Sequence, residues 1–138
     1  MAAESKSRIA RVTSPAAPEP QPGTWSNCLV VNGVAYVAGL VARGEDGKPV
    51  QGGEYEQAKA IFVKMRGLIE AAGGSMADVV KVVIFVTDIK NREQVWRARR
   101  EVFSGNFPVS TLVQVAALAS PDLKVEIEAI AHLGAGAR

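Results

Sequence analysis

Eight consecutive residues, Val79–Val86, are apolar at every position except Lys81 and are rich in valine and isoleucine. An unbroken apolar run with many β-branched residues predicts a strand that is buried on most of both faces. Such a strand lies inside a sheet that other elements cover. This run therefore constrains the fold more than any other segment, and the patterns on either side of it indicate what the cover is.

Helical periodicity precedes and follows this strand. Before it, apolar residues recur three and four positions apart, which predicts one face of a helix that Gly73-Gly74 ends. That face comprises Ala58, Ile61, Phe62, Met65, Leu68, Ile69 and Ala72. After the strand, residues 92–103 predict a second helix, with Asn91 and Gln94 spaced as a capping box.

Turn residues and alternation predict strands near the start of the chain. Residues 27–31 and 34–39 flank Asn32-Gly33, the dipeptide most typical of a two-residue hairpin turn. Residues 7–12 alternate between polar and apolar and predict a short edge strand.

The remaining segments are predicted as loops and two late strands. Residues 15–23 hold four of the seven prolines and predict an extended connector, and residues 43–53 predict a glycine-rich loop. Residues 111–118 and 124–131 predict two strands around a turn at 120–122.

The resulting order, β-β-β-α-β-α-β-β, predicts an α+β fold with a mixed sheet and both helices on one face. Its other face carries valine, isoleucine and leucine without a cover, so we expect self-association. A length of 138 residues fits a single domain over 1–138. Residues 1–6 and 134–138 are expected to be flexible ends.

Composition excludes several classes of function. A net charge of +2 gives no case for nucleic-acid binding. One cysteine, Cys28, and one histidine, His132, rule out a disulfide and a multi-cysteine or multi-histidine metal site within the chain. No apolar stretch reaches the length of a membrane span and no secretory signal is recognised, so we expect a cytoplasmic protein without a membrane partner.

In order and spacing, several short motifs resemble the Rid family, also called YjgF or L-PSP endoribonuclease. They are Trp25-Ser26, Ala38-Gly39, Gln57, Leu-Ile-Glu-Ala-Ala-Gly at 68–73, Asp78-Val-Val-Lys-Val, Phe85-Val-Thr-Asp, Phe107-Pro108 and Val125-Glu-Ile-Glu-Ala-Ile-Ala. The resemblance covers residues 22–131 and implies a chorismate-mutase-like fold of the bacillus type. It also implies a homotrimer whose clefts between subunits bind a small molecule without a cofactor or metal.

Family members hydrolyse 2-imino and 2-enamino acids to 2-keto acids and ammonia, using a glutamate on the last strand and an arginine that binds the substrate carboxylate. The resemblance places Glu126 at the glutamate and Ser110 at the arginine. A neutral hydroxyl makes a weaker contact with a carboxylate than a planar guanidinium does. The sequence contains Arg43, after the Gly39 strand end, as another cation able to reach a cleft.

The candidate site residues each have a structural alternative. Glu126 is the candidate catalytic group, and it shares a strand face with Glu128, so both are otherwise solvated carboxylates. The substrate-binding candidates are Ser110, Thr111, Trp25, Trp96 and Gly39. These residues otherwise serve strand pairing, interface packing or a tight strand end. The basic residues of 90–100 are interpreted as a solvated helix face.

We therefore expect a deaminase-like hydrolase acting on a reactive imine or enamine other than the usual 2-imino acid. The alternative is a trimeric protein that binds a small ligand, or acts like a chaperone, without catalysis. A ribonuclease ranks third.

Overall fold

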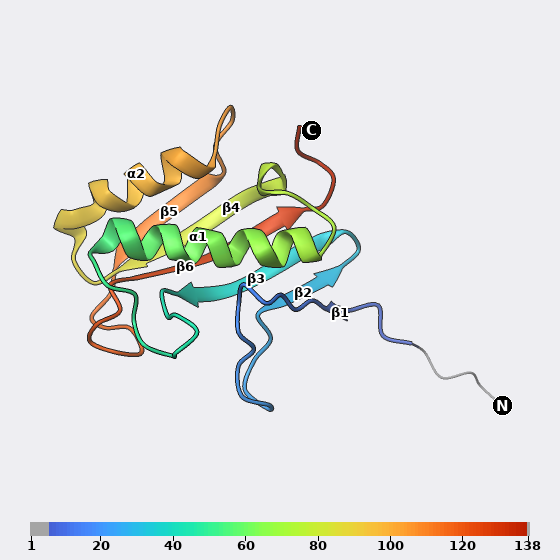
Figure 1. Cartoon of the computed structure of the whole chain (residues 1–138). Helices are drawn as coiled ribbons and strands as arrows, with labels where there is room; N and C mark the ends of the chain where they lie inside the picture. Colours follow the sequence, from blue (N-terminus) through green and yellow to red (C-terminus); the bar gives the residue numbers. More distant parts are fainter. Residues whose placement is uncertain (1–5, 138) are drawn as a thin grey trace.

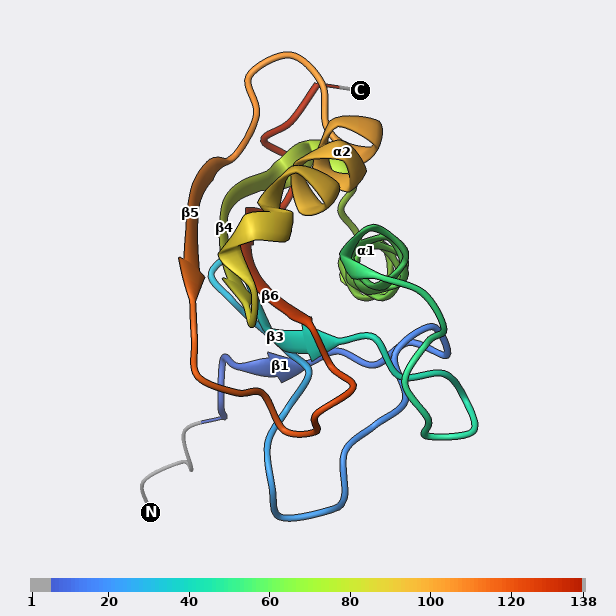
Figure 2. The ribbon, with the colours of Figure 1, turned by 90° about the vertical axis from the view of Figure 1, so that its left-hand side faces the viewer.

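A six-stranded mixed sheet with both long helices on one of its faces forms the domain (Figures 1 and 2). The computed structural model describes residues 6–137. The strands lie in the order β1-β2-β3-β6-β4-β5, and every neighbouring pair is antiparallel except β4 and β5. The elements are β1 (Ala10–Arg11), β2 (Cys28–Val31), β3 (Val34–Val41), α1 (Glu54–Ala71), η1 (Met76–Asp78), β4 (Val79–Val86), η2 (Ile89–Asn91), α2 (Arg92–Val102), β5 (Val109–Gln114) and β6 (Val125–His132).

The hairpin predicted around Asn32-Gly33 joins β2 and β3. Asn32 has φ 50° and Gly33 has φ 76°, and the closing pair is Val31 with Val34. Both central residues occupy the left-handed region that this tight turn requires, which glycine and asparagine adopt at low cost. The local sequence is therefore sufficient to form this corner of the sheet.

Strand β4 spans the residues that the apolar run predicts, and it lies between β6 and β5. Val82, Ile84 and Val86 are fully buried under the helices, whereas Val83 and Phe85 point to the opposite face and are half-buried. Burial on the second face is therefore incomplete in the single chain.

Helix α1 covers the middle of the sheet with the apolar face that its periodicity predicts. Six of the seven predicted residues are buried: Ala58, Ile61, Phe62, Met65, Leu68 and Ile69. Helix α2 lies beside α1 and adds buried Val95 and Ala98, and the ring of Phe103 meets that of Phe62 edge to face at 5.7 Å. The core thus lies between the helix layer and one sheet face.

The sheet face opposite the helices, seen from its edge in Figure 2, carries several exposed apolar side chains. Tyr36 is 48% exposed, Val113 is 41% exposed and Val109 is 67% exposed. No helix of the described residues is both long and apolar enough to cross a membrane. A second protein surface is the cover that an apolar sheet face of this kind favours.

Three local predictions need correction. The strand expected at 111–118 runs instead over Val109–Gln114. Asn91 makes no side-chain cap, and the Gln94 Oε1 accepts a hydrogen bond of 3.4 Å from the Tyr55 backbone instead. The proline-rich connector contains a turn, Ser14 to Ala17, whose Ala17 is buried. For Gln94 a contact with the distant helix α1 replaces the expected local cap.

The C-terminal end is attached to the domain, in contrast to the expected flexible segment 134–138. The buried Asp78 carboxylate accepts hydrogen bonds from the backbone amides of Gly134 at 3.0 Å and Gly136 at 2.8 Å. It also accepts one from the amide of Ser75 at 3.0 Å. Residues 1–5 and 138, which belong to the expected flexible ends, lie outside the described residues.

Candidate functional site

Glu126 lies on the sheet face that the helices leave open. It pairs with Val41 of β3 and Phe85 of β4, while its chain neighbours Val125 and Ile127 are buried under the helices. Its carboxylate lies over Gly39, where an added Cβ would sit 2.5 Å from Oε2. The strand pairing shifts register at this point, between Val37 and Leu40. Gly39 therefore makes room for the Glu126 carboxylate.

The surroundings of Glu126 favour its protonated form. Partial burial raises the pKa of Glu126 above its ordinary value, and the negative charge of Glu128 on the same strand face raises it further. A carboxyl group with a raised pKa exchanges a proton more readily near neutral pH than a solvated one. This property suits a group that takes a proton from water or returns one to a leaving nitrogen.

Ser110 lines a different pocket, between β5 and α2. Because Ser110 pairs with Val82 in the parallel β4–β5 ladder, its side chain points to the helix side of the sheet. The pocket has a volume of about 440 Å³. It is lined by Ile89, Arg92, Trp96, Arg99, Phe107, Pro108, Ser110 and Leu112.

Arg99 lies beside Ser110, the residue at which the resemblance expects an arginine. Its Nη1 donates a hydrogen bond of 2.8 Å to the Ser110 Oγ. Burial, and then the charge of Arg100, lower the pKa of Arg99 from its ordinary value. The expectation that the basic residues of 90–100 form a solvated helix face is therefore wrong for Arg99.

The indole of Trp96 lies close to two guanidinium groups in this pocket. Arg92 Cζ is 5.5 Å from the ring centroid and Arg99 Cζ is 5.9 Å from it. Cations at this separation are attracted by the ring quadrupole. Trp96, a predicted site residue, therefore helps to position the cations that share its pocket.

The other predicted site residues lie apart from Ser110. Thr111 pairs with Val83 and points to the open face. Trp25 lies in the loop before β2, is 58% exposed, and donates from Nε1 to the Asn27 Oδ1 at 3.2 Å. Arg43 donates to the Gly47 carbonyl at 3.0 Å and so closes its own loop.

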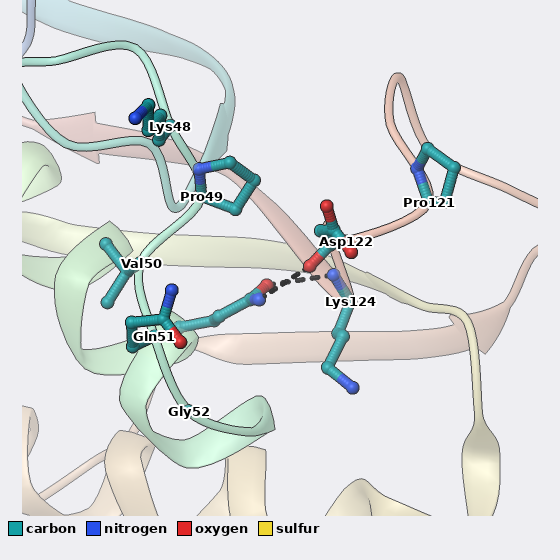
Figure 3. A pocket seen from close by; sticks show the side chains of 9 residues that line it. Lys48, Pro49, Val50, Gln51, Gly52, Pro121, Asp122 and Lys124 are labelled. Carbon is teal, nitrogen blue, oxygen red and sulfur yellow. Dashed lines mark hydrogen bonds between the residues drawn. The ribbon is translucent and has the colours of Figure 1, made fainter.

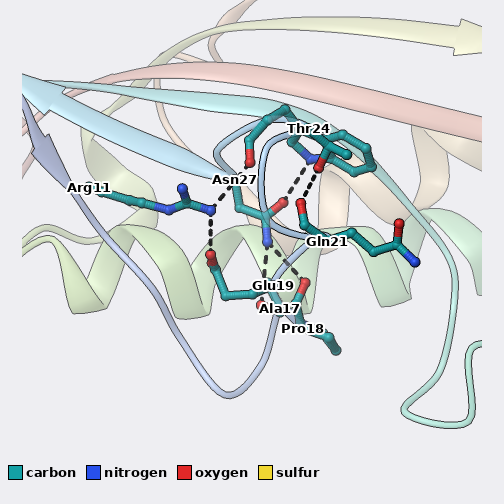
Figure 4. A network of polar contacts seen from close by, with 8 residues as sticks. Arg11, Ala17, Pro18, Glu19, Gln21, Thr24 and Asn27 are labelled. Carbon is teal, nitrogen blue, oxygen red and sulfur yellow. Dashed lines mark hydrogen bonds and ion pairs between the residues drawn. The ribbon is translucent and has the colours of Figure 1, made fainter.

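A polar network attaches the loop that carries Trp25 (Figure 4). Asn27 Nδ2 donates to the carbonyl of Pro18 at 3.1 Å and to that of Ala17 at 3.4 Å. Arg11 forms an ion pair with Glu19 at 2.6 Å and donates to the Trp25 carbonyl at 3.3 Å. These contacts hold the indole of Trp25 on the surface beside the start of β2.

A further pocket of about 440 Å³ lies between the loop after β3 and the loop before β6 (Figure 3). Gln57, 1% exposed, donates to the Asp122 carbonyl at 2.8 Å and accepts from the Lys124 backbone amide at 2.8 Å. Its side chain thus fixes the loop before β6, and none of the predicted site residues lines this pocket.

The candidate residues therefore form two groups on opposite faces of one sheet. Ser110 and Trp96 belong to the pocket under α2, and Gly39 and Glu126 belong to the open face. Sequence reasoning missed Arg99, although its spacing of three from Trp96 places both on one helix side. Within residues 6–137, no group of three or more histidine, cysteine, aspartate or glutamate side chains is arranged to hold a metal ion.

Comparisons with known proteins agree in fold and sequence. Residues 15–133 match the family model described as endoribonuclease L-PSP. The human protein named 2-iminobutanoate/2-iminopropanoate deaminase is 33% identical over 129 residues, covering 93% of each chain.

Two solved structures are also similar. A Pseudomonas aeruginosa protein of unknown function has a TM-score of 0.83 at 34% identity, covering 93% of this chain and 94% of its own. RidA from an Antarctic Psychrobacter has a TM-score of 0.82 at 30% identity, covering 90% of this chain and 99% of its own.

Proposed function

This chain belongs to the endoribonuclease L-PSP family, which is the Rid family, and on that premise we propose that it hydrolyses a reactive imine or enamine to a carbonyl compound and ammonia. Relatives at this level of identity are named as deaminases of 2-iminobutanoate and 2-iminopropanoate. The observation that carries the proposal is the half-buried Glu126 carboxylate over Gly39, with its raised pKa.

The reaction needs a group that transfers protons, and it needs no oxidant or reductant. The oxygen of water adds to the imine carbon, and the resulting carbinolamine loses ammonia as its C–N bond breaks. Glu126 takes a proton from the attacking water and passes it to the imine nitrogen. It then takes the proton of the carbinolamine hydroxyl and gives it to the same nitrogen as ammonia leaves. A pKa raised toward neutrality suits both transfers, because the same carboxyl group has to take and give the proton.

The proposed site is completed by a second copy of the chain. Glu126 and Ser110 point to opposite faces of one sheet, so one small ligand touches both only if each comes from a different copy. The exposed apolar residues of the open face, among them Tyr36 and Val113, favour such an assembly. We propose a homotrimer with the ligand clefts between subunits.

The substrate is proposed to differ from the two small imino acids named for relatives. Its carboxylate is not held by an arginine on β5, since Ser110 stands there, and the adjoining pocket wall is the bulky Trp96. We propose that the reaction takes place in the cytoplasm.

The test generates imines in situ by oxidising alanine, 2-aminobutanoate and phenylalanine with an amino-acid oxidase and follows the rate of imine loss. We expect wild-type protein to accelerate hydrolysis of at least one imine, and Glu126→Gln to lower kcat about 100-fold or more, as expected for a general base. Glu70→Gln is the matched control, because Glu70 is exposed on α1.

Two results would contradict the proposal. If no imine is hydrolysed faster although small ligands bind, the protein is a binding module. If the activity survives in Glu126→Gln, the carboxylate has a structural role only. Cleavage of RNA that is lost in Glu126→Gln would instead support the ribonuclease that the family description names.

A further inference from the structure

We propose that Arg99, together with Ser110, binds the carboxylate of the substrate, and that the substrate is an imino or enamino acid with an apolar side chain that lies against Trp96 and Phe107. This inference rests on the proposed function for the reaction. The binding pocket itself stands on separate observations, which can be tested without catalysis.

The first observation is an unsatisfied donor. The Nε of Arg99 is buried and has no hydrogen-bond partner, and it is the one side-chain nitrogen or oxygen of that kind within residues 6–137. Leaving a buried charged donor without an acceptor is costly. Since Nε is shielded from solvent and Nη1 already donates to Ser110, a second partner reaches the guanidinium through the terminal nitrogens, on the side that lines the pocket.

The second observation is the charge of the pocket. Arg92 and Arg99 both line it, and none of its lining residues is acidic. The ion pairs within the described chain involve other arginines, Arg11 with Glu19 and Arg100 with Glu93. A half-buried guanidinium without a counter-ion favours an anion from outside the chain. A carboxylate matches its planar donors in two contacts at once.

The third observation concerns the remaining walls. Trp96, Phe107, Leu112 and Ile89 form an apolar surface beside the two cations, and Phe107 is 43% exposed. An exposed aromatic ring next to an unpaired cation matches a ligand that is charged at one end and apolar at the other. A pocket volume of about 440 Å³ admits a side chain as large as a benzyl group.

This arrangement also accounts for Ser110. A serine in place of the expected arginine leaves space on β5 for a cation from another element, and its hydroxyl accepts a hydrogen bond from that cation. The cation thus comes from α2, eleven residues earlier in the chain. Arg99 determines specificity for an acid, while Ser110 is a positioning residue for Arg99.

The experiment measures binding of phenylpyruvate and of its uncharged amide by the indole N–H signal of Trp96 in two-dimensional NMR spectra. Trp25 supplies the second indole signal, and Trp96→Phe assigns the two. We expect wild-type protein to bind the acid at least about tenfold more tightly than the amide, the ratio that a charge-assisted pair supplies. Arg99→Gln should raise the Kd of the acid about tenfold or more and abolish this preference.

The matched control is Arg100→Gln, which removes the same charge one position away, outside the residues that line the pocket. It should change both Kd values less than twofold. If Arg99→Gln does not fold, Arg99→Lys replaces it. Lysine keeps the charge without the planar pair of donors. We then expect the preference for the acid to persist while the Kd of the acid rises several-fold.

Equal affinity of wild-type protein for acid and amide would overturn the inference. An unchanged preference for the acid in Arg99→Gln would also overturn it. If Arg99→Gln keeps this preference but no longer assembles, Arg99 is an interface residue, and the inference is again overturned. Arg99-dependent acid binding in a protein without deaminase activity would overturn the proposed function and support this inference. Deaminase activity that is independent of Arg99 would support the proposed function and overturn this inference.

Discussion

Glu126 illustrates how a single carboxylate acquires its properties from packing. Its partial burial and the nearby Glu128 raise its pKa, and Gly39 leaves the space that the side chain occupies. The alternation of Val125, Glu126 and Ile127 predicts the face on which it lies. Its contact with Gly39 depends on the pairing of β3 with β6 and on the register shift in that pair.

A pH-dependent stability follows from the raised pKa of Glu126. The folded protein holds this proton more tightly than the unfolded chain, so the unfolded chain releases it first as the pH rises. The free energy of unfolding therefore falls between the unfolded-state pKa, about 4.3, and the higher folded-state pKa. We expect Glu126→Gln to remove this decline, so that the variant gains stability relative to wild type as the pH rises through that window.

Urea unfolding at a series of pH values and one protein concentration measures this difference. Glu70→Gln, in which an exposed carboxylate is replaced, should show no such trend. A difference between Glu126→Gln and wild type that stays constant from about pH 4 to pH 7 would contradict the raised pKa.

At the scale of elements, the turn η1, which precedes β4, binds the segment that follows β6 through hydrogen bonds. Its Asp78 carboxylate accepts hydrogen bonds from three backbone amides, those of Ser75, Gly134 and Gly136. Gly136 packs against Ala77, and an added Cβ at Gly136 would collide with the Ala77 backbone. The segment after β6 is therefore part of the folded domain.

Replacing Asp78 by alanine should destabilise the protein by about 1–3 kcal/mol or more, because partly buried amides lose their acceptor. Removal of residues 134–138 should cost a similar amount, since it breaks two of the same hydrogen bonds. Thermal or urea unfolding measures both changes. Asp122→Asn is the control, because Asp122 is exposed and contributes its backbone carbonyl to Gln57. Unchanged stability of the truncated chain would restore the prediction of a flexible end.

At the scale of the whole molecule, one sheet presents the two halves of the proposed site on opposite faces. The helix side of the sheet carries Arg99 and Ser110, and the open side carries Glu126. Figure 2 shows both helices on one side of that sheet. A ring of copies in which the open face of one meets the edge strand β5 of the next would join these halves. The function of the protein is then a property of the assembly.

Mixing two inactive variants tests this arrangement. We expect a mass of about three times 14.6 kDa by light scattering. Trimers refolded from equal amounts of Glu126→Gln and Arg99→Gln should regain about one quarter of wild-type activity, because a quarter of random interfaces join two intact halves. The variants refolded separately and then combined are the control. A monomer at micromolar concentration, or a mixture no more active than its parents, would contradict a shared site.

Local patterns in the sequence are sufficient to predict the elements whose stability is local. The Asn32-Gly33 turn, the apolar face of α1 and the unbroken run of β4 each carry their own pattern, because turn conformation and hydrophobic periodicity act over a few residues. The order of these elements then implies the mixed sheet with both helices on one face. The motif that begins at Val125 places Glu126 on the last strand in the same way, from a few neighbouring residues.

Which side chains meet depends on how the elements pack together. The spacing of three from Trp96 indicates the helix side on which Arg99 lies, but only the contact with Ser110 on β5 shows its role. Gln57 fixes a loop more than 60 residues away, and Asp78 binds amides more than 50 residues away. Such contacts join segments that are distant along the chain, so they follow from the packing of helices on the sheet and have no local signature. Arg99 and Glu126 likewise lie on opposite sides of the sheet, because α2 packs on one face and Glu126 points to the other.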